Sequence, residues 1–218
     1  MLDWVIYTLA IIVFFLTHSI PVRPANKAKV VAQLGARGFT LSYSALSIAA
    51  LSFVIYAANH APIVELWPWA PWQNHVTLLA MAVSVTIAAL AIARPNPLSF
   101  GGRNNHTFNP HAAGIVGWTR HPLLVALLLW ALGHLIPNGN LAHVILFGLF
   151  ASFSFLGKRI IDKRNQRLLG LETWQHLSHT QRDIAITRTG LIRACIGIAI
   201  YLLLLHVHSA IIGVTPLP

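Results

Sequence analysis

Acidic residues and cysteine are the scarcest functional side chains in this chain of 218 residues. Aspartate and glutamate together number five against fifteen lysines and arginines, and Cys195 is the single cysteine. One cysteine excludes an internal disulfide, a cysteine-based zinc finger and a CxxC redox pair. Because Asp3, near an outer end, is the only acid within the predicted spans, proton pumping through carboxylates is disfavoured. Neither an HExxH zinc motif nor a GxSxG elbow occurs, so no hydrolase centre is visible.

Apolar residues are abundant. Hydrophobic residues make up 56% of the chain, charged residues only 9%, and the mean hydropathy is +0.67. A soluble domain carries roughly 25% charged residues, so this composition indicates a polytopic membrane protein. The first apolar segment has no basic stretch before it and no convincing cleavage site. We therefore expect it to be a retained span and not a signal peptide.

Six apolar segments approach the length of about 20 residues that a transmembrane helix needs. They cover residues 2–20, 39–58, 72–93, 122–136, 141–157 and 191–214. The fourth and fifth are short and are joined by a turn-like Pro-Asn-Gly-Asn, which predicts a helical hairpin. The sequence therefore predicts an all-α transmembrane helix bundle of about six spans, forming a single membrane domain over residues 1–218. A five-span alternative, in which one short segment is merged or lost, stays open.

The basic residues agree with six spans. All fifteen fall on one side of the membrane if six segments cross it, which is the pattern of positive-inside topology. This predicts a multi-pass membrane protein with both termini on the side opposite the cytoplasm. The basic excess then reports orientation in a lipid bilayer, and no nucleic-acid partner is expected. Residues 158–181 predict an amphipathic helix with a basic face on the inner leaflet.

Two of the twelve histidines begin and end one apolar segment. His121 precedes Pro122, a residue favoured at the first helical position, so His121 is expected at a helix cap. Beside Arg120 it could serve as a ligand or hold an anionic group. His134 lies thirteen residues later, roughly 140° around a straight helix, so the two rings cannot share one pocket. Trp130 precedes His134 by one turn and could face a flat cofactor, although ordinary interhelical packing explains both residues equally.

Several short motifs together resemble the NnrU family of bacterial membrane proteins, whose plant relative is 15-cis-zeta-carotene isomerase. They are Phe14-Phe-Leu-Thr-His18-Ser, Leu66-Trp-Pro-Trp, Thr119-Arg-His121-Pro, Trp130-Ala-Leu-Gly-His134-Leu and Gly157-Lys-Arg. The resemblance covers about residues 1–190. Bacterial members are associated with denitrification and nitric-oxide metabolism, and the isomerase acts on a hydrophobic small molecule.

The resemblance implies a protein of the bacterial inner membrane, with both termini in the periplasm, and a b-type haem held by His18 and His134. Arg120, His121 and Trp130, singled out above on their own chemistry, are the candidates for further contacts with this cofactor. The isomerase has histidines in its fifth span, where this chain has apolar residues, so the isomerase activity itself is not carried over. Simple depth along straight helices favours other pairs, either His18 with His121, or His134 with His206 or His208.

A second resemblance is to membrane methyltransferases of the isoprenylcysteine carboxyl methyltransferase type, which carry Arg-His-Pro before a basic segment. It implies that Arg120 and His121 contribute to binding S-adenosylmethionine, with a small thiol as substrate. The glutamate pair of those enzymes is missing from residues 162–170, although Gly170-Leu-Glu-Thr-Trp174 is similar to their Gly-x-x-x-Tyr element. A non-catalytic accessory membrane protein is the third alternative.

Overall fold

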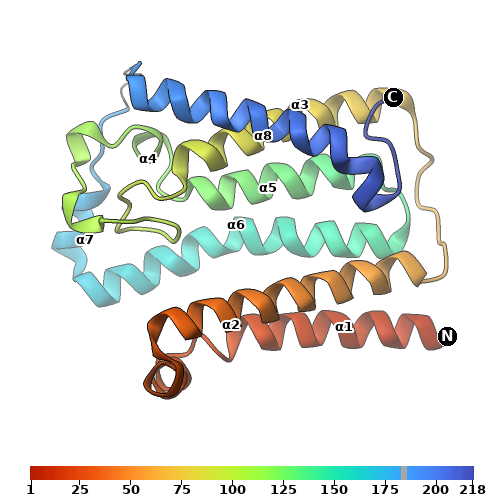
Figure 1. Ribbon diagram of the computed structural model, residues 1–218, viewed down its shortest axis with the longest axis horizontal. Helices are drawn as coiled ribbons and strands as arrows, with labels where there is room; N and C mark the ends of the chain where they lie inside the picture. The colour runs from red at the N-terminus through yellow and green to blue at the C-terminus, as the bar shows by residue number, and fades with distance from the viewer. Residues whose placement is uncertain (183–185) are drawn as a thin grey trace. The chain divides into compact units, whose positions relative to one another are not determined.

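The computed structural model of the protein describes residues 1–182 and 186–218. The fold is all-α: these residues form eight α-helices and two short 3-10 turns, and they contain no strand beyond an isolated bridge between Glu65 and Asn140. The elements, shown in Figure 1, are α1 (Leu2–Ser19), α2 (Pro24–His60), α3 (Pro71–Ala91), η1 (Asn105–Thr107), η2 (Pro110–Ala112), α4 (Ile115–Trp118), α5 (Pro122–Leu135), α6 (Leu141–Leu169), α7 (Leu171–Ser178) and α8 (Arg188–Ile212).

Five helices are long and apolar enough to cross a membrane, namely α1, α2, α3, α6 and α8. The sixth predicted span is α5, which has only 14 residues. At 1.5 Å per residue it is about 21 Å long, less than the roughly 30 Å of a hydrocarbon core. Five long helices and one short helix agree approximately with the predicted six spans. The chain is therefore a multi-pass membrane protein.

Two helices extend beyond the predicted spans. Helix α2 begins at Pro24, well before residue 39, and Gly35 interrupts it with φ 73° and ψ 169°. Helix α6 does not end at residue 157, because lysine and arginine are good helix formers and the helix continues through them to Leu169. The single amphipathic helix predicted over residues 158–181 is therefore not formed. Gly170, with φ 80°, ends α6 and starts the short helix α7 in a new direction.

Contacts within the chain group its residues into two compact units. The first unit consists of residues 1–66 and 140–143. In it α1 packs against α2. The hydroxyl of Tyr7 donates to the carbonyl of Ala142 at 2.7 Å, and the amide of Leu141 donates to the carbonyl of Val64 at 2.8 Å. These bonds attach the start of α6 to this unit.

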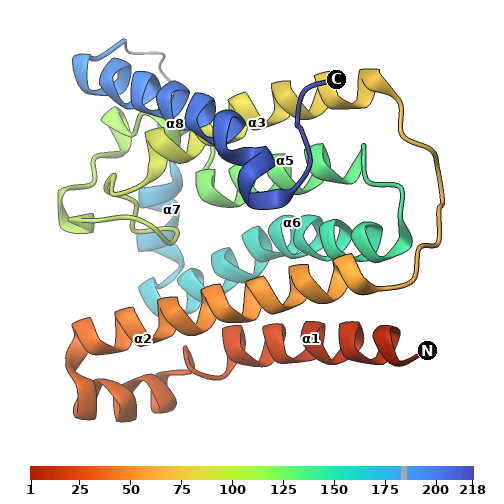
Figure 2. The same cartoon turned by 45° about the vertical axis from the view of Figure 1, so that its right-hand side comes forward.

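The second unit consists of residues 67–139 and 144–218. Its helix α3 packs against both α5 and α8, as the two views in Figures 1 and 2 show. Small residues allow this close approach: a Cβ on Gly133 would meet the Cβ of Ala80 at 3.0 Å, and one on Gly197 would meet the Cα of Thr86 at 3.0 Å. Such close approach through small residues is the usual way in which helices associate in membranes.

Hydroxyl groups on α3 also bond to the backbone of its neighbours. Thr77 donates to the carbonyl of Gly133 at 2.7 Å, and Ser84 donates to the carbonyl of Ala126 at 2.7 Å. On α8, Tyr201 donates to the carbonyl of Leu78 at 3.1 Å. These bonds connect α5 and α8 to α3 and keep the two ends of α5 in place, where the candidate sites lie.

Candidate functional site

Two pockets lie in the second unit, one toward each end of α5. We call the first the arginine pocket; it has a volume of about 580 Å³ and its lining includes Arg120, His121, Lys158, Asp162, His179 and Arg182. We call the second the histidine cavity; it has a volume of about 590 Å³ and its lining includes Thr77, Met81, His134, Tyr201, Leu205 and His208. Both volumes lie in the range of small-molecule and cofactor sites.

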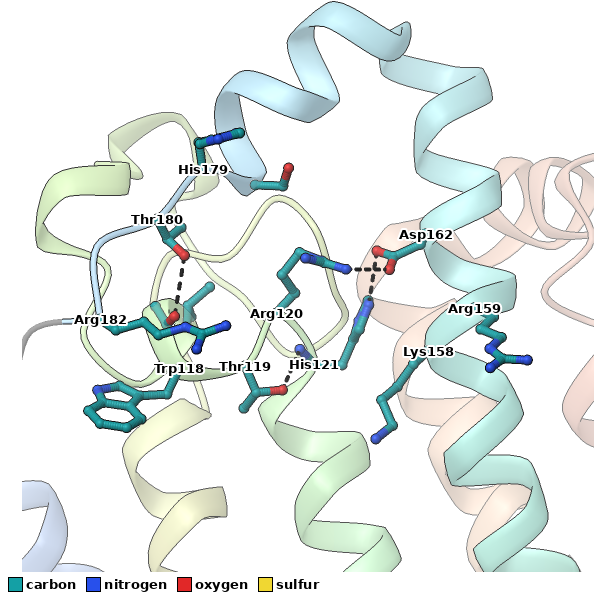
Figure 3. Close-up of a pocket in the computed structure, with 13 residues that line it drawn as sticks. Trp118, Thr119, Arg120, His121, Lys158, Arg159, Asp162, His179, Thr180 and Arg182 are labelled. Atoms are coloured by element: carbon teal, nitrogen blue, oxygen red, sulfur yellow. Dashed lines mark hydrogen bonds and ion pairs between the residues drawn. The ribbon is translucent and has the colours of Figure 1, made fainter.

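Arg120 and His121 converge on one carboxylate in the arginine pocket. Nη2 of Arg120 lies 2.9 Å from Oδ2 of Asp162, and Nε2 of His121 lies 3.0 Å from its Oδ1 (Figure 3). Asp162 is on the part of α6 that extends past the predicted span. The carboxylate therefore joins the segment before α5 to the end of α6, and it compensates one of the positive charges that line the pocket.

His121 is buried and both of its ring nitrogens are bonded. Its side chain is 4% exposed, and Nδ1 lies 3.0 Å from the hydroxyl of Ser99. Burial lowers the pKa of His121 below its ordinary value of 6.5, against the opposing effect of Asp162, and the charges of Arg120 and Lys158 lower the pKa further. A neutral ring satisfies both contacts when Nε2–H donates to Asp162 and Nδ1 accepts from Ser99. No nitrogen of His121 is left to bind a metal ion.

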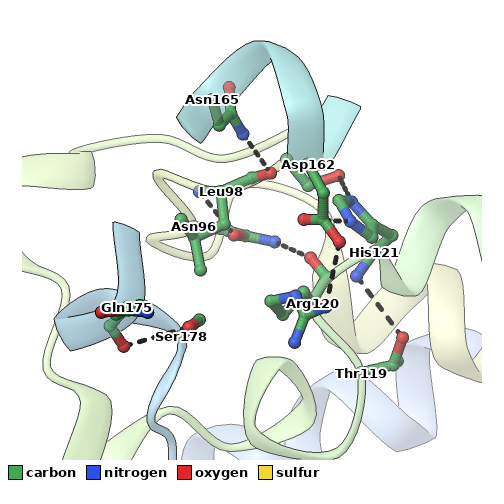
Figure 4. Close-up of polar contacts among 10 residues, drawn as sticks. Asn96, Leu98, Thr119, Arg120, His121, Asp162, Asn165, Gln175 and Ser178 are labelled. Carbon is green, nitrogen blue, oxygen red and sulfur yellow. Dashed lines mark hydrogen bonds and ion pairs between the residues drawn. The ribbon is translucent and has the colours of Figure 1, made fainter. Parts of the chain in front are cut away.

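Asparagine side chains hold the loop after α3 against this site (Figure 4). Asn96 donates from Nδ2 to the carbonyl of Arg120 at 2.9 Å, and its Oδ1 accepts from the amide of Leu98 at 3.1 Å. From α6, Asn165 donates to the carbonyl of Leu98 at 2.7 Å. Residues 96–118 are largely irregular and contain only η1, η2 and the four-residue helix α4.

Helix α7 supplies the aromatic partner of Arg120. The guanidinium carbon lies 5.2 Å from the ring centroid of Trp174, a cation–π arrangement. Nε of Arg120 and Nε1 of Trp174 are both buried, and neither donates to another atom of the described chain. A buried donor without an acceptor is the kind of feature that a bound ligand or an ordered water satisfies; of these two residues, Arg120 lines the arginine pocket and Trp174 does not.

His134 lies on the wall of the histidine cavity with one of its two ring nitrogens bonded. Nδ1 of His134 lies 2.8 Å from the carbonyl of Trp130. Because a carbonyl only accepts, Nδ1 carries the hydrogen and Nε2 keeps its lone pair. His60 and His75 make the same bond to a carbonyl one turn earlier, but neither lines either pocket. The position of His134 on the cavity wall, and not its hydrogen bond, is what sets it apart.

His208 lines the same cavity from α8. Its Nδ1 lies 2.8 Å from the carbonyl of Val214, so its Nε2 also keeps the lone pair. The residues after α8 complete the wall, since Val214 through Pro218 all line the cavity and Asn74 donates to the carbonyl of Leu217 at 3.2 Å. His206, two residues before His208 on the same helix, is exposed and does not line the cavity.

Trp130 packs beside the cavity. Its ring centroid lies 5.2 Å from that of His134, and it meets Phe147 and Phe150 edge-on at 5.4 and 5.6 Å. The predicted pairing of Trp130 with His134 is confirmed, and α6 supplies the aromatic residues around it. Trp130 is not among the residues that line the cavity.

The predicted site residues are divided among three places. Arg120 and His121 line the arginine pocket, His134 lines the histidine cavity, and His18 belongs to the first unit. There Nδ1 of His18 lies 2.8 Å from the carbonyl of Phe14, which leaves its Nε2 free of that bond. The prediction that His121 and His134 do not share a pocket is confirmed. Thirteen helical residues put their backbones about 20 Å apart, so a haem ligated by His134 would not reach Arg120 with its propionates.

Asp162 is the site residue that the sequence analysis missed. One signal was available: it is the only acid within a run of bases that includes Lys158, Arg159 and Lys163. An isolated acid among bases at the end of an apolar helix is a candidate for pairing with a cation on a neighbouring element. Which cation it meets depends on long-range packing and could not be read from spacing.

Apolar helices of spanning length, with a site at each end of a short central helix, define a multi-pass α-helical membrane protein. A protein-family model described as NnrU protein matches residues 6–216, so this chain belongs to the NnrU family. The match extends through α8, farther than the predicted limit near residue 190. No curated protein and no solved structure matches the chain.

Proposed function

We propose that this protein binds a b-type haem in the inner membrane and acts in redox chemistry linked to denitrification or nitric-oxide metabolism, with His134 as an iron ligand. The observation that carries the proposal is the position of His134. It presents a nitrogen lone pair at the wall of a largely apolar cavity, and its Nδ1–H is held by the carbonyl of Trp130. A metal-binding histidine is usually oriented by such a bond from its other ring nitrogen.

The donor set fits a haem better than it fits a bare metal ion. Within residues 1–182 and 186–218, no group of three or more His, Cys, Asp or Glu side chains could hold an ion. A porphyrin brings four nitrogen ligands of its own, so one or two imidazoles complete the coordination of its iron. Leucines and Met81 on the cavity wall suit the macrocycle, and Asn74, Asn138 and Tyr201 offer polar atoms at the same wall.

The family resemblance assigns His18 as the second ligand. The test is the absorption spectrum of the full chain, purified in detergent after expression with haem supplied, in its oxidised and reduced forms. We expect a Soret band that is lost in His134→Ala and, if the family pair holds, in His18→Ala. His179→Ala, which alters a residue lining the arginine pocket, is the matched control and should keep the band. A folded wild-type protein without a Soret band would overturn the proposal.

We further propose that both termini lie in the periplasm, since all fifteen lysines and arginines then face the cytoplasm. A reporter that is active only in the cytoplasm, fused after Pro218, should give no signal. The same reporter fused after Gly170, which follows the basic part of α6, should be active. Strong activity after Pro218 would exclude this topology.

The arginine pocket favours a second candidate function, S-adenosylmethionine-dependent methyl transfer to a small thiol. The specific observation is that the Arg-His-Pro segment meets the following basic helix through Asp162. In methyltransferases of the similar type, the corresponding two regions bind the cofactor. Arginine recognises carboxylates well, and Lys158 and Arg182 line the pocket beside Arg120.

Equilibrium binding of labelled S-adenosylmethionine to the purified chain tests this second function. Saturable binding that Arg120→Lys weakens and that Arg193→Lys leaves unchanged would support it. Arg193 is the matched control because it bonds to carbonyls of α3, away from the pocket. A protein that shows neither saturable binding of S-adenosylmethionine nor a Soret band would favour the third function, that of a non-catalytic accessory protein.

A further inference from the structure

We propose that His208 is the second histidine ligand of the iron, so that a haem in the histidine cavity would be held between α5 and α8. This inference rests on the proposed haem-binding function and departs from the pair that the family resemblance implies. It assigns a role to α8 and to the residues that follow it. It also predicts that iron in this site has no open coordination position.

His134 and His208 line the same cavity from different helices. Helix α5 contributes His134 near its end, at Leu135, and α8 contributes His208 near its own end, at Ile212. Both helices pack against α3. The two rings therefore belong to one compact unit, whereas His18 belongs to the other unit.

His134 and His208 are held in the same tautomer. Nδ1 of each ring lies 2.8 Å from a backbone carbonyl, Trp130 for His134 and Val214 for His208. Each Nδ1 thus carries a hydrogen, and each Nε2 is the atom with the lone pair. A neutral imidazole with Nδ1–H bonded to a carbonyl is the state in which histidine binds a metal through Nε2.

The carbonyl partner of His208 does not come from its own helix. Histidines within α1, α3 and α5 bond to a carbonyl four residues earlier, which any helical histidine can do. His208 instead bonds forward to Val214, after Gly213 has ended α8 with φ 88°. The returning segment, closed by the bond between Asn74 and Leu217, fixes the ring and covers the cavity.

The spin state of the haem and its binding of carbon monoxide show whether the iron has two histidine ligands or one. A haem with two histidine ligands is low-spin and suited to one-electron exchange, whereas loss of one ligand opens a position at which carbon monoxide binds. His206→Ala is the matched control, because His206 is exposed on the same helix and does not line the cavity. His18→Ala tests the pair implied by the family.

The experiment compares haem content, spin state by absorption and electron paramagnetic resonance, and carbon monoxide binding in these variants and the wild type. We expect a low-spin wild type. His208→Ala should lose on the order of tenfold in haem affinity or become high-spin and bind carbon monoxide, since even residues that orient a ligand contribute 10- to 100-fold. Added imidazole should restore the low-spin spectrum, which separates a lost ligand from misfolding. His206→Ala and His18→Ala should match the wild type.

Two results would overturn the assignment of His208 while leaving haem binding intact. One is a low-spin His208→Ala protein that binds no carbon monoxide, together with a His18→Ala protein that is high-spin. The other is a wild-type haem that is already high-spin. A folded wild-type protein without a Soret band would instead overturn the proposed function itself.

Discussion

The two pockets at the ends of α5 each contain one of its histidines, and the two rings differ in what they have left to offer. His121 is 4% exposed with both nitrogens bonded, to Asp162 and to Ser99. His134 has one nitrogen bonded and lies at the wall of a cavity. A histidine whose two nitrogens are satisfied by side chains joins structural elements. One with a backbone-bonded Nδ1 and an accessible Nε2 is arranged like a metal ligand.

The pockets also differ in charge. Among the residues that the structure describes, the arginine pocket is lined by the cations of Arg120, Lys158, Arg159 and Arg182 and by the carboxylate of Asp162. The described side chains that line the histidine cavity include no lysine, arginine, aspartate or glutamate. The first pocket suits an anionic ligand and the second an apolar one. The predictions below test whether the two pockets are as independent as this difference indicates.

The largest expected effect is on haem content, and it should separate the two histidines. His134→Ala removes an iron ligand and should lower haem binding by on the order of tenfold or more. His121→Ala leaves the cavity untouched, about 20 Å away along α5, and should keep most of the haem. Quantifying haem per folded protein measures both. Equal losses in the two variants would mean that the pockets do not act separately.

The next effect is on stability, and it concerns the arginine pocket. Asp162→Asn keeps the shape of the side chain but removes the charge that bonds to Arg120 and His121. Hydrogen bonds to a charged group contribute about 2 kcal/mol, which corresponds to a fall in Tm of about 6 °C for a chain of this size. Thermal unfolding in detergent measures it. Asp3→Asn, at an exposed position in α1, should leave Tm unchanged.

A smaller effect is expected from Arg120→Lys. The lysine keeps the positive charge near Asp162 but loses the planar group that lies over Trp174. The Arg120 side chain is 37% exposed, so solvent reduces the effect to about 1 kcal/mol. Arg37→Lys, at an exposed position on α2 that does not line the pocket, is the control for a general loss of arginine. If both substitutions lower Tm equally, Arg120 has no specific role.

The smallest effect is a dependence of stability on pH. The pKa of His121 is lower in the folded protein than its ordinary value of 6.5, so the unfolded chain binds the additional proton first. This contribution to the free energy of unfolding is complete above 6.5 and is lost as the pH falls from 6.5 toward the lowered pKa. His121→Gln should therefore show a smaller drop in Tm between about pH 7.5 and about pH 5.5 than the wild type. An identical drop would show that other groups control the pH dependence.

Much of the second unit could be predicted from local patterns. The span predicted at 72–93 is α3 (Pro71–Ala91), and the cap predicted at His121 is the N-cap of α5, with Pro122 at its first position. These features depend on apolar length and on proline chemistry, both of which are local. The separation of His121 from His134 also follows from helical geometry alone.

The contacts that build the two pockets could not be predicted in the same way. Asp162 meets Arg120 across 42 residues of sequence. Depth along straight helices did favour His134 with His206 or His208, but which of the two lines the cavity depends on how α5 and α8 pack against α3. Neither contact leaves a periodic trace in the chain. The length of α6 could not be read from the predicted span for a different reason: a helix that leaves the bilayer can continue through lysines and arginines, so the change in composition does not mark its end.

The backbone carbonyl that precedes each histidine of α5 accepts a bond from a side chain on the same stretch of chain. Thr77 on α3 donates to Gly133, just before His134, and Asn96 in the loop after α3 donates to Arg120, just before His121. Helix α5 is thus held at both ends by hydrogen bonds from residues 77–96. A movement of α5 along its axis would have to break or stretch both hydrogen bonds together. The register of α5 against residues 77–96 is therefore fixed, and a ligand at one end would not slide the helix toward the other pocket.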